Sequence, residues 1–539
     1  MPAFRNRVLF LATILSVVFL IVVLRFFILQ SNEGDDLLKD AVAQQRNGVL
    51  LFRERGDILD RKGIPFTNRE GKTLAVFPPG LPTFSGSNDG EGSDTAPYAV
   101  PVSSEEISSV AAFHPNIVFA DIPVRYAGRS LAAHVTGYLR KSDGTGISSL
   151  EEKFNSRLSG SSIMTAILAD ATRKPLPGSG IRLLKADSGN APLDLRLTLD
   201  YSIQRIVEDE MDNLIPKGAV VVMDAMTGDV LAMASRPDFD REDVDAAMSD
   251  PDGSSLFNRA VAAYSPGSVF KIVDAAAALE EGLYSRYRCN GSISFGSLHF
   301  RCYDGTSHGE LGLEQAFVQS CNTFFIRLGI DVGAEKILAM AARLGLGKST
   351  GIQEQGIAES SGHLPSAREA GSYGDAANIS IGQGEVSVTP LQAAAMVCAI
   401  ASHGVLPPVN VTDALLDQNG NIVQKLRSGS ARRVIPAHVA RMLEEMMYKV
   451  TGTVGTGSRA NLDDIGGAAG KTGSAEAVKS DGSPTVHAWF VGYFPVEEEP
   501  RTVISVFVED GGMGGDVSAP VFAAIARKIH ALNLLRQSR

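Results

Sequence analysis

A long apolar run stands near the start of the chain. Residues 8–24 carry no charge, and the run continues past Arg25 with residues 26–29. At about 1.5 Å per residue in a helix, the whole segment is long enough to cross a bilayer, with Arg25 reaching toward the interface. Residues 26–30 offer no small-x-small cleavage site, so the pattern favours an uncleaved anchor over a removed signal peptide.

Charges on the two sides of this run predict its orientation. Arg5 and Arg7 precede it, and acidic Glu33, Asp35 and Asp36 follow it. Because basic residues stay on the cytoplasmic side, the N-terminus is expected in the cytoplasm and the rest of the chain outside. The sequence therefore predicts a single-pass membrane protein.

The region after the apolar run is rich in turns and short strands. Residues 53–63 are charged, contain two glycines and predict a surface hairpin with ion pairs, and residues 85–95 have the composition of a flexible loop. Residues 117–160 mix short strands with glycine-rich turns, and no catalytic constellation is found there. A structural or interaction module is expected from about residue 48 to 190.

From Leu195 onward the pattern changes to regular helices and strands. Asp200 is a candidate cap for a helix with one apolar face, and residues 219–223 and 230–234 have the pattern of a hairpin. Further helices are expected at 268–279, 313–318, 436–450 and 520–535, and further strands at 470–475, 486–493 and 503–508. This order predicts an α+β domain, with one mostly antiparallel sheet and helices on its faces.

Composition excludes some function classes. The chain has 539 residues, with 50 basic and 61 acidic side chains and a formal net charge of −11. We find no basic stripe interleaved with aromatic residues, so nucleic acid is not an expected partner.

The cysteines leave three interpretations open. Four are too few for a disulfide framework, but Cys289 and Cys302 flank an expected strand-turn-strand at 292–300. One disulfide there is plausible in an oxidising compartment, and unpaired buried thiols are an equally good interpretation. Zinc binding is the third, and no Cys-x-x-Cys spacing supports it.

The first candidate for chemistry lies at the start of the alanine-rich helix. Ser268 falls at or inside its first turn, and Lys271 comes three residues later on the same face. A lysine with a lowered pKa can take the proton of a serine hydroxyl, and the helix N-terminus favours an oxyanion at the serine. Ser-x-x-Lys alone is a weak signal.

Two further short motifs follow in the same domain. Ser320-Cys-Asn322 stands where one helix is expected to end, so Asn322 is also a candidate helix cap, and Lys471-Thr-Gly-Ser474 lies on a late strand. A phosphate-binding P-loop is excluded by spacing, because Ile465 stands where its first glycine belongs.

Together, these three motifs resemble those of the penicillin-recognising serine acyltransferases. The charged stretch Arg55-Gly-Asp-Ile-Leu-Asp-Arg-Lys-Gly63 behind the apolar run is similar to the N-terminal signature of class B penicillin-binding proteins. Residues 125–138, 146–151, 233–238, 381–384 and 389–390 also resemble motifs of that class. The usual fourth residue of the lysine motif is Thr, and Ser474 keeps its hydroxyl.

The resemblance implies a fold and a division of the chain. Residues 1–30 would form a cytoplasmic tip and transmembrane anchor, and residues 31–194 an elongated, β-rich pedestal or dimerisation-type domain. Residues 195–539 would form a transpeptidase domain related to serine β-lactamases. The implied reaction is the D,D-transpeptidation that cross-links peptidoglycan stem peptides ending in D-Ala-D-Ala, with β-lactams as inhibitors.

The resemblance also assigns roles to individual residues. Ser268 would attack the penultimate D-Ala, with Lys271 as general base, Ser320 as proton relay and Asn322 orienting the substrate amide and Lys271. Lys471, Thr472, Gly473 and Ser474 would bind the substrate, with charge and hydroxyls on its carboxylate, and the backbone N–H groups of Ser268 and Ser474 would form the oxyanion hole. His308, His487 and Trp489 are expected to be structural or substrate-groove residues.

The resemblance also implies a partner protein, and alternative functions remain open. By resemblance, a membrane glycan polymerase of the SEDS family would make the glycan strands, and no metal or organic cofactor is implied. A β-lactam hydrolase or sensor on the same domain, or an inactive membrane-anchored scaffold, are the alternative functions. The sequence does not indicate whether the protein acts in cell elongation, division or sporulation.

Overall fold

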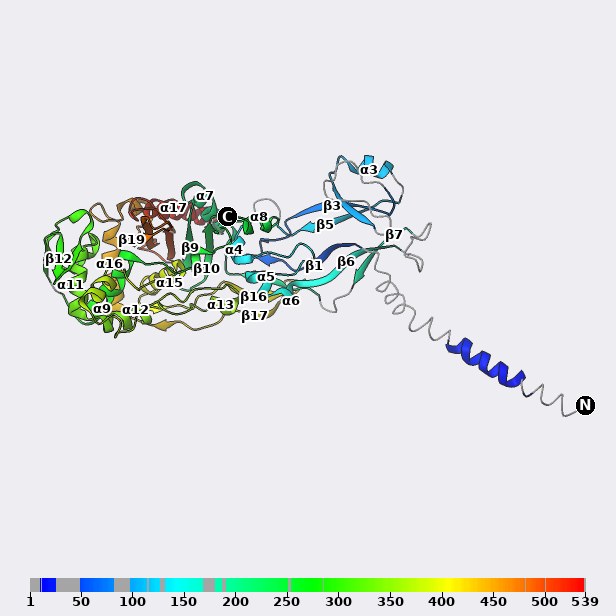
Figure 1. Cartoon of the computed structure of the whole chain (residues 1–539), viewed down its shortest axis with the longest axis horizontal. Helices are drawn as coiled ribbons and strands as arrows, with labels where there is room; N and C mark the ends of the chain where they lie inside the picture. The colour runs from blue at the N-terminus through cyan, green and yellow to red at the C-terminus, as the bar shows by residue number, and fades with distance from the viewer. Residues whose placement is uncertain are drawn as a thin grey trace, which may run out of the picture. The chain divides into compact units, whose positions relative to one another are not determined.

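The computed structural model describes residues 10, 12–25, 49–81, 97–113, 116–126, 131–167, 180–186, 191–250, 254–284, 286–479, 481–499 and 501–537 (Figure 1). Contacts group the chain into two compact units. The first comprises Met1–Glu54, Glu70–Val124 and Gly160–Asn190, and the second Arg55–Arg69, Arg125–Ser159 and Ala191–Arg539. Residues 55–69 and 125–159 thus pack with the C-terminal part of the chain. The expected domains at 1–30, 31–194 and 195–539 remain a prediction.

The N-terminal apolar segment is described only in part. Residues 12–25 are helical, whereas residues 26–29 of the expected span and the expected loop at 85–95 lie outside the described residues. Among the helices that are described, none is both long and apolar enough to cross a membrane.

The first unit is built mainly of strands. One three-stranded sheet has the order β1-β6-β7, and another has the order β4-β3-β5. Phe77 and Tyr98 stack with ring centroids 4.8 Å apart in a small core that also contains Val110. The elements are β1 Leu50–Arg55, β6 Ser159–Ile167, β7 Ile181–Ala186, β3 Glu70–Phe77, β4 Tyr98–Val102, β5 Val118–Val124 and α3 Ile107–Phe113.

A five-stranded antiparallel sheet forms the centre of the second unit. Its order is β10-β9-β21-β20-β19, and its strands are β9 Gly218–Asp224, β10 Val230–Arg236, β19 Ala469–Val478, β20 Pro484–Phe494 and β21 Thr502–Val508. In β9, Val220 and Val222 belong to one hydrophobic cluster and Val221 and Met223 to another. Side chains alternate between the faces of a strand, so both faces of this sheet are buried.

Helices cover these two faces. On one face lie α7 (Tyr201–Leu214), which Asp200 caps as predicted, and α17 (Ser518–Gln537). On the other lie α9 (Lys271–Glu280), α15 (Pro390–Ala401) and α16 (Ala437–Val450), and every residue of α15 is buried. The predicted α+β domain, with helices on the faces of a mostly antiparallel sheet, is confirmed.

Shorter elements complete the second unit. A four-stranded sheet of order β17-β16-β8-β2 is built from β2 Ile58–Leu59, β8 Asp194–Leu197, β16 Thr412–Leu416 and β17 Ile422–Lys425. The remaining strands are β11 Tyr287–Cys289, β12 Ser292–Phe295, β13 Leu298–Arg301, β14 Gly309–Leu311, β15 Val405–Leu406 and β18 Arg432–Arg433. The remaining helices are α4 Ala133–Thr136, α5 Ser149–Lys153, α6 Asn155–Leu158, α8 Val244–Met248, α10 Leu313–Val318, α11 Asn322–Val332, α12 Ala334–Arg343, α13 Ile352–Gln355 and α14 Tyr373–Ile379.

The charged stretch at 53–63 does not form the expected surface ion pairs at Arg55. The Arg55 side chain is 4 % exposed and lies 2.6 Å from Glu151, which is fully buried and also pairs with Arg125 at 2.8 Å. Burial would raise the pKa of Glu151, but the charges of Arg125 and Arg55 outweigh it and lower that pKa. Three motifs that are distant in the sequence therefore meet in one buried ion cluster.

Candidate active site

Ser268 lies in a tight turn that leads into a buried helix. A 3-10 turn at Gly267–Phe270 precedes α9, which begins at Lys271. Gly267 has a φ of +52°, and a Cβ there would lie 2.9 Å from the carbonyl oxygen of Ser474. A Cβ on Gly473 would likewise lie 2.7 Å from the carbonyl oxygen of Pro266. The two glycines therefore allow the serine turn and strand β19 to approach each other closely.

Ser320 and Asn322 lie at the junction of two helices. Helix α10 ends at Val318, Ser320 has a left-handed φ of +53°, and α11 begins at Asn322. Asn322 is therefore not the helix cap, because Cys321 occupies that position. Its side chain instead accepts a hydrogen bond from Lys271 Nζ at 2.7 Å and donates one to the carbonyl oxygen of Arg301 at 3.1 Å.

Two buried lysines meet at the Ser320 hydroxyl. Lys271 Nζ donates to the Ser320 carbonyl at 2.7 Å and lies 3.2 Å from Ser320 Oγ. From the other side, Lys471 Nζ lies 2.9 Å from the same Oγ. Both lysine side chains are 0 % exposed. One hydroxyl therefore joins the two amines in a continuous hydrogen-bonded chain.

Burial shapes the charge of this pair. It lowers the pKa of Lys271 to about 8, against the opposing influence of Cys321 and Cys302. Burial, together with the positive charge of Lys271, also holds the pKa of Lys471 well below its ordinary value. Two positive charges in one buried site repel each other, so the doubly protonated pair loses its first proton easily.

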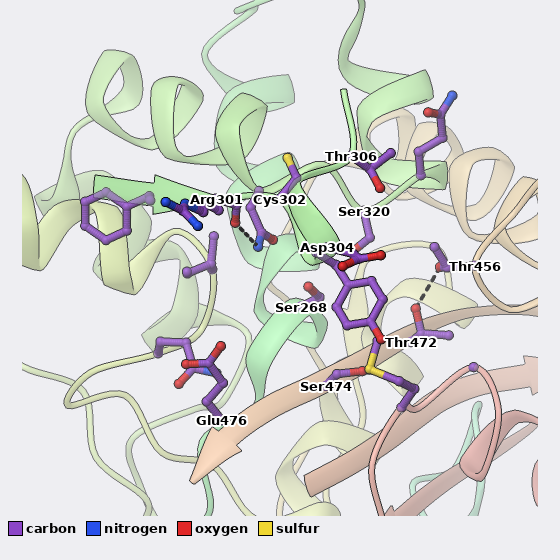
Figure 2. A pocket seen from close by; sticks show the side chains of 18 of the residues that line it. Ser268, Arg301, Cys302, Asp304, Thr306, Ser320, Thr456, Thr472, Ser474 and Glu476 are labelled. Atoms are coloured by element: carbon purple, nitrogen blue, oxygen red, sulfur yellow. Dashed lines mark hydrogen bonds between the residues drawn. The ribbon is translucent and has the colours of Figure 1, made fainter. Parts of the chain in front are cut away.

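Strand β19 presents alternate side chains to a cavity (Figure 2). Thr472 Oγ1 lies 2.7 Å from Thr456 Oγ1, and Ser474 Oγ accepts a hydrogen bond from the backbone N–H of Gly514 at 3.1 Å. Lys471 points to the opposite side, where it reaches Ser320. The strand therefore supplies two hydroxyls to the cavity and one amine to its buried wall.

The cavity brings the three predicted motifs together. Its volume is about 1070 Å³, and its lining includes Ser268, Ser320, Asn322, Thr472 and Ser474. Figure 2 shows Ser268, Ser320 and Ser474 around the same space. The structure thus assembles the residues that the sequence singled out, and their individual roles remain predictions. Among the described residues, Ser268 Oγ has no hydrogen bond to Lys271, whose three protons are directed at Ser320 and Asn322.

Sequence reasoning missed other parts of the lining. Residues 299–306 form one wall, and Arg301 in it accepts the hydrogen bond of Asn322. Thr456, which meets Thr472, stands in a run at 451–457 that consists of Thr and Gly except for Val454. That run marks a tight loop, but no sequence signal tells which strand it meets.

Comparison with known proteins agrees with this geometry. Residues 218–527 match the family model of the penicillin binding protein transpeptidase domain. The chain belongs to this family. The predicted resemblance to class B penicillin-binding proteins is thereby confirmed.

Two curated relatives of this transpeptidase family member show how far the likeness extends. Stage V sporulation protein D of Bacillus subtilis is 30% identical, over 97% of this chain and 85% of the relative. Peptidoglycan D,D-transpeptidase PbpA of Mycolicibacterium smegmatis is 29% identical, over 64% of this chain and 74% of the relative. The likeness to the first therefore includes the N-terminal region as well as the transpeptidase domain.

Solved structures agree with the fold. A chain from a study of the structural coordination of polymerization and crosslinking by a peptidoglycan synthase complex has a TM-score of 0.71 and 27% identity, covering 97% of this chain and 98% of its own. Penicillin binding protein 3 from Mycobacterium tuberculosis, complexed with aztreonam, has a TM-score of 0.65 and 27% identity, covering 89% and 96%. The penicillin-binding protein fold therefore extends over most of this chain.

Proposed function

We propose that this protein is a peptidoglycan D,D-transpeptidase that works through a Ser268 acyl-enzyme and is inhibited by β-lactams. The observation that carries the proposal is the chain of contacts from Lys271 through Ser320 to Lys471, because Ser320 lines the same cavity as Ser268. The relative named peptidoglycan D,D-transpeptidase and the aztreonam complex support the same reaction.

The reaction transfers an acyl group in two steps. Ser268 Oγ attacks the carbonyl carbon of the penultimate D-Ala while Lys271 takes the hydroxyl proton. The backbone N–H groups of Ser268 and Ser474 stabilise the oxyanion, and Ser320 passes a proton to the departing D-Ala amine. An amine of a neighbouring stem peptide then attacks the ester, forms the cross-link and returns the proton to Ser268.

The number of protons on Lys271 and Lys471 suggests how Lys271 becomes the general base. Lys271 directs three hydrogen bonds at acceptors, as a protonated amine does. A substrate carboxylate bound at Thr472 and Ser474 attracts positive charge to Lys471. A proton then moves from Lys271 through the Ser320 hydroxyl to Lys471, which leaves Lys271 neutral beside Ser268. Substrate binding itself therefore prepares the general base.

The N-terminal part has a supporting role in this proposal. Residues 8–29 anchor the chain in the bacterial cell membrane with the N-terminus inside, and residues 31–194 form the elongated pedestal domain. The apolar, uncharged sequence of residues 8–24 supports the anchor. The similar chain in a peptidoglycan synthase complex supports a SEDS-family glycan polymerase as the partner.

The test is the mass of the intact full-length chain in detergent after incubation with benzylpenicillin, followed over hours beside Ser268→Ala. We expect one stable adduct on the wild type and none on the variant. Rapid loss of the adduct with turnover of the drug would identify the alternative β-lactam hydrolase. Complete absence of an adduct would favour the inactive scaffold.

A further inference from the structure

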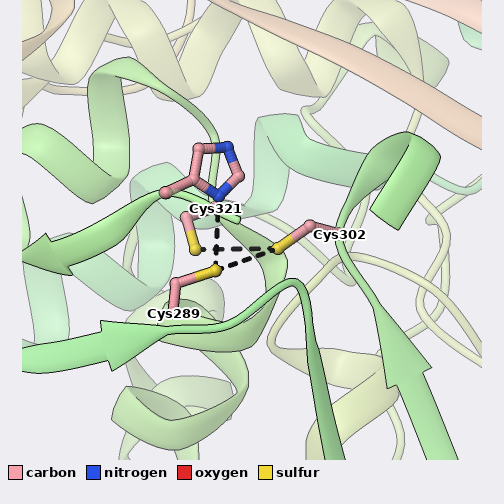
Figure 3. A group of neighbouring side chains, drawn as sticks. Cys289, Cys302 and Cys321 are labelled. Atoms are coloured by element: carbon pink, nitrogen blue, oxygen red, sulfur yellow. Dashed lines mark hydrogen bonds between the residues drawn. The ribbon is translucent and has the colours of Figure 1, made fainter. Parts of the chain in front are cut away.

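Four potential metal ligands that the proposed reaction does not use converge at a wall of the active-site cavity, which Cys302 and His308 help to line. They are Cys289 at the end of β11, Cys302 after β13, His308 before β14 and Cys321 at the start of α11. Their ligand atoms all lie within 4.8 Å of one another. Figure 3 shows the three cysteine sulfurs pointing toward a common centre.

The spacing of these atoms fits a tetrahedral ion. Cys302 Sγ lies 3.7 Å from both Cys289 Sγ and Cys321 Sγ, and Cys289 Sγ lies 3.4 Å from His308 Nδ1. Around tetrahedral Zn²⁺, bond lengths of about 2.3 Å to sulfur and about 2.0 Å to nitrogen place two sulfurs about 3.8 Å apart and sulfur and nitrogen about 3.5 Å apart. A disulfide instead needs sulfurs about 2.05 Å apart. The observed distances therefore match shared coordination rather than a covalent bond.

The environment of the sulfurs also suits thiolates on a metal. All three cysteines are buried and free of disulfides. The backbone N–H of Gly291 donates to Cys289 Sγ at 3.4 Å, and Thr323 Oγ1 lies 3.4 Å from Cys321 Sγ and 3.6 Å from Cys302 Sγ. Such outer contacts orient metal ligands and stabilise their charge. Weak S–H hydrogen bonds alone give no reason to gather three thiols and an imidazole in one buried place.

We propose that Cys289, Cys302, His308 and Cys321 bind one Zn²⁺ in a closed, structural site. Three thiolates and an imidazole are a soft donor set that favours zinc over Mg²⁺ or Ca²⁺, whose ligands are oxygens. Four protein ligands fill the tetrahedron, so the ion holds no reactive water. The absent Cys-x-x-Cys spacing is no objection, because the fold brings the ligands from four separate segments.

The ion also positions the catalytic centre. Cys321 stands between Ser320, which contacts both lysines, and Asn322, which contacts Lys271. Cys302 follows Arg301, whose carbonyl oxygen accepts the hydrogen bond of Asn322. A Zn²⁺ bound to Cys302 and Cys321 therefore ties a wall of the cavity to the motif that holds the lysines. This consequence rests on the proposed function, whereas zinc binding itself does not.

The first test measures metal in the full-length protein from zinc-supplemented cells by mass spectrometry of the metal. We expect about one zinc per chain in the wild type, in Ser268→Ala and in Cys398→Ser, a matched change of a buried cysteine outside the site. Cys289→Ser and Cys321→Ser should lose nearly all of it. Wild-type protein without zinc, or ligand variants that keep it, would overturn the proposal.

A second measurement needs no variant and so does not depend on the folding of one. Titration of the wild type with an organomercurial thiol reagent should release zinc, seen with a chromogenic chelator, in step with modification of the buried thiols. Replacement of zinc by Co²⁺ should give the thiolate charge-transfer and visible bands of a tetrahedral site. Reaction of the thiols without release of metal, or the spectrum of six-coordinate Co²⁺, would refute the site. Because Ser268→Ala keeps zinc, failure of transpeptidation and failure of metal binding remain distinguishable.

Discussion

The acylation of Ser268 by a β-lactam should slow as the pH rises through about 8, because the lysine pair then loses its last positive charge. Burial lowers the pKa of both Lys271 and Lys471, and the charge of Lys271 lowers that of Lys471 further. The proposed reaction needs one proton on the pair, since a neutral Lys271 is the base and a charged Lys471 holds the carboxylate. The singly charged pair is therefore the active form.

The size of the effect follows from the pKa of Lys271 at about 8. The fraction of pairs that keep one charge is about 90% at pH 7, about 9% at pH 9 and about 1% at pH 10. The acylation constant should therefore fall about tenfold between pH 7 and pH 9. Toward acid pH it should also fall, because a second proton on the pair removes the base.

The assay is the second-order acylation constant of the full-length protein, measured by stopped flow from pH 6 to pH 10. Benzylpenicillin should show the alkaline fall. Its methyl ester lacks the carboxylate and needs no charge on Lys471, so its constant should not fall above pH 8. A constant for benzylpenicillin that stays level or rises to pH 10 would refute the reasoning. An equal fall for both compounds would refute it too, because another group or unfolding would then be the cause.

Three further substitutions test the surroundings of the site. Glu151→Gln leaves Arg55 and Arg125 buried without a counter-charge and should lower the free energy of unfolding, measured with urea, by about 3–5 kcal/mol. The control Glu152→Gln changes an exposed residue and should alter that free energy little. Equal stability of the two variants would contradict the role of the buried ion cluster. Gly473→Ala pushes a Cβ against the Pro266 carbonyl and should slow acylation at least tenfold, while Gly312→Ala, with open space around it, should not. Asp274 is fully buried and makes no hydrogen bond to described residues, and burial raises its pKa, so its carboxyl is neutral. Asp274→Asn should therefore leave the alkaline fall of the acylation constant at the same pH. A shift of this fall toward lower pH would show that the carboxylate is charged.

Periodicity predicted the elements that are defined by local pattern. The continuous apolar runs at 219–223 and 230–234 pair as the expected hairpin, in strands whose faces are both buried. Helix α17 begins at Ser518 and ends at Gln537, so it is two residues longer at each end than the expected helix at 520–535. Order along the chain also sufficed to select the three motifs that meet at the cavity, because each has a fixed local spacing, and the roles of their residues remain predictions.

Contacts between residues that are distant in the sequence follow no local spacing, so the sequence did not predict them. Glu151 lies 96 residues from Arg55, and its two arginines carry no spacing rule, so the stretch was expected at the surface. The sequence did not predict the cluster of Cys289, Cys302, His308 and Cys321 for the same reason. Cys302 and Cys321 are 19 residues apart, and the turn between them is fixed only when β13, β14 and α11 pack together. Sequence reasoning therefore selects motifs whose residues keep a fixed local spacing, and it misses contacts between distant residues that follow no such spacing.

The Ser320-Cys-Asn322 tripeptide is where the two kinds of site meet. Ser320 faces the lysines, Cys321 faces the other cysteines and Asn322 faces Lys271 and the Arg301 carbonyl. Three consecutive side chains can take these directions because Ser320 is left-handed and a helix begins directly after Cys321. A serine at position 321 would keep the backbone atoms but lose the tie to the ion. If zinc positions the catalytic centre, Cys321→Ser should therefore slow acylation of Ser268, whereas Cys398→Ser should leave it unchanged.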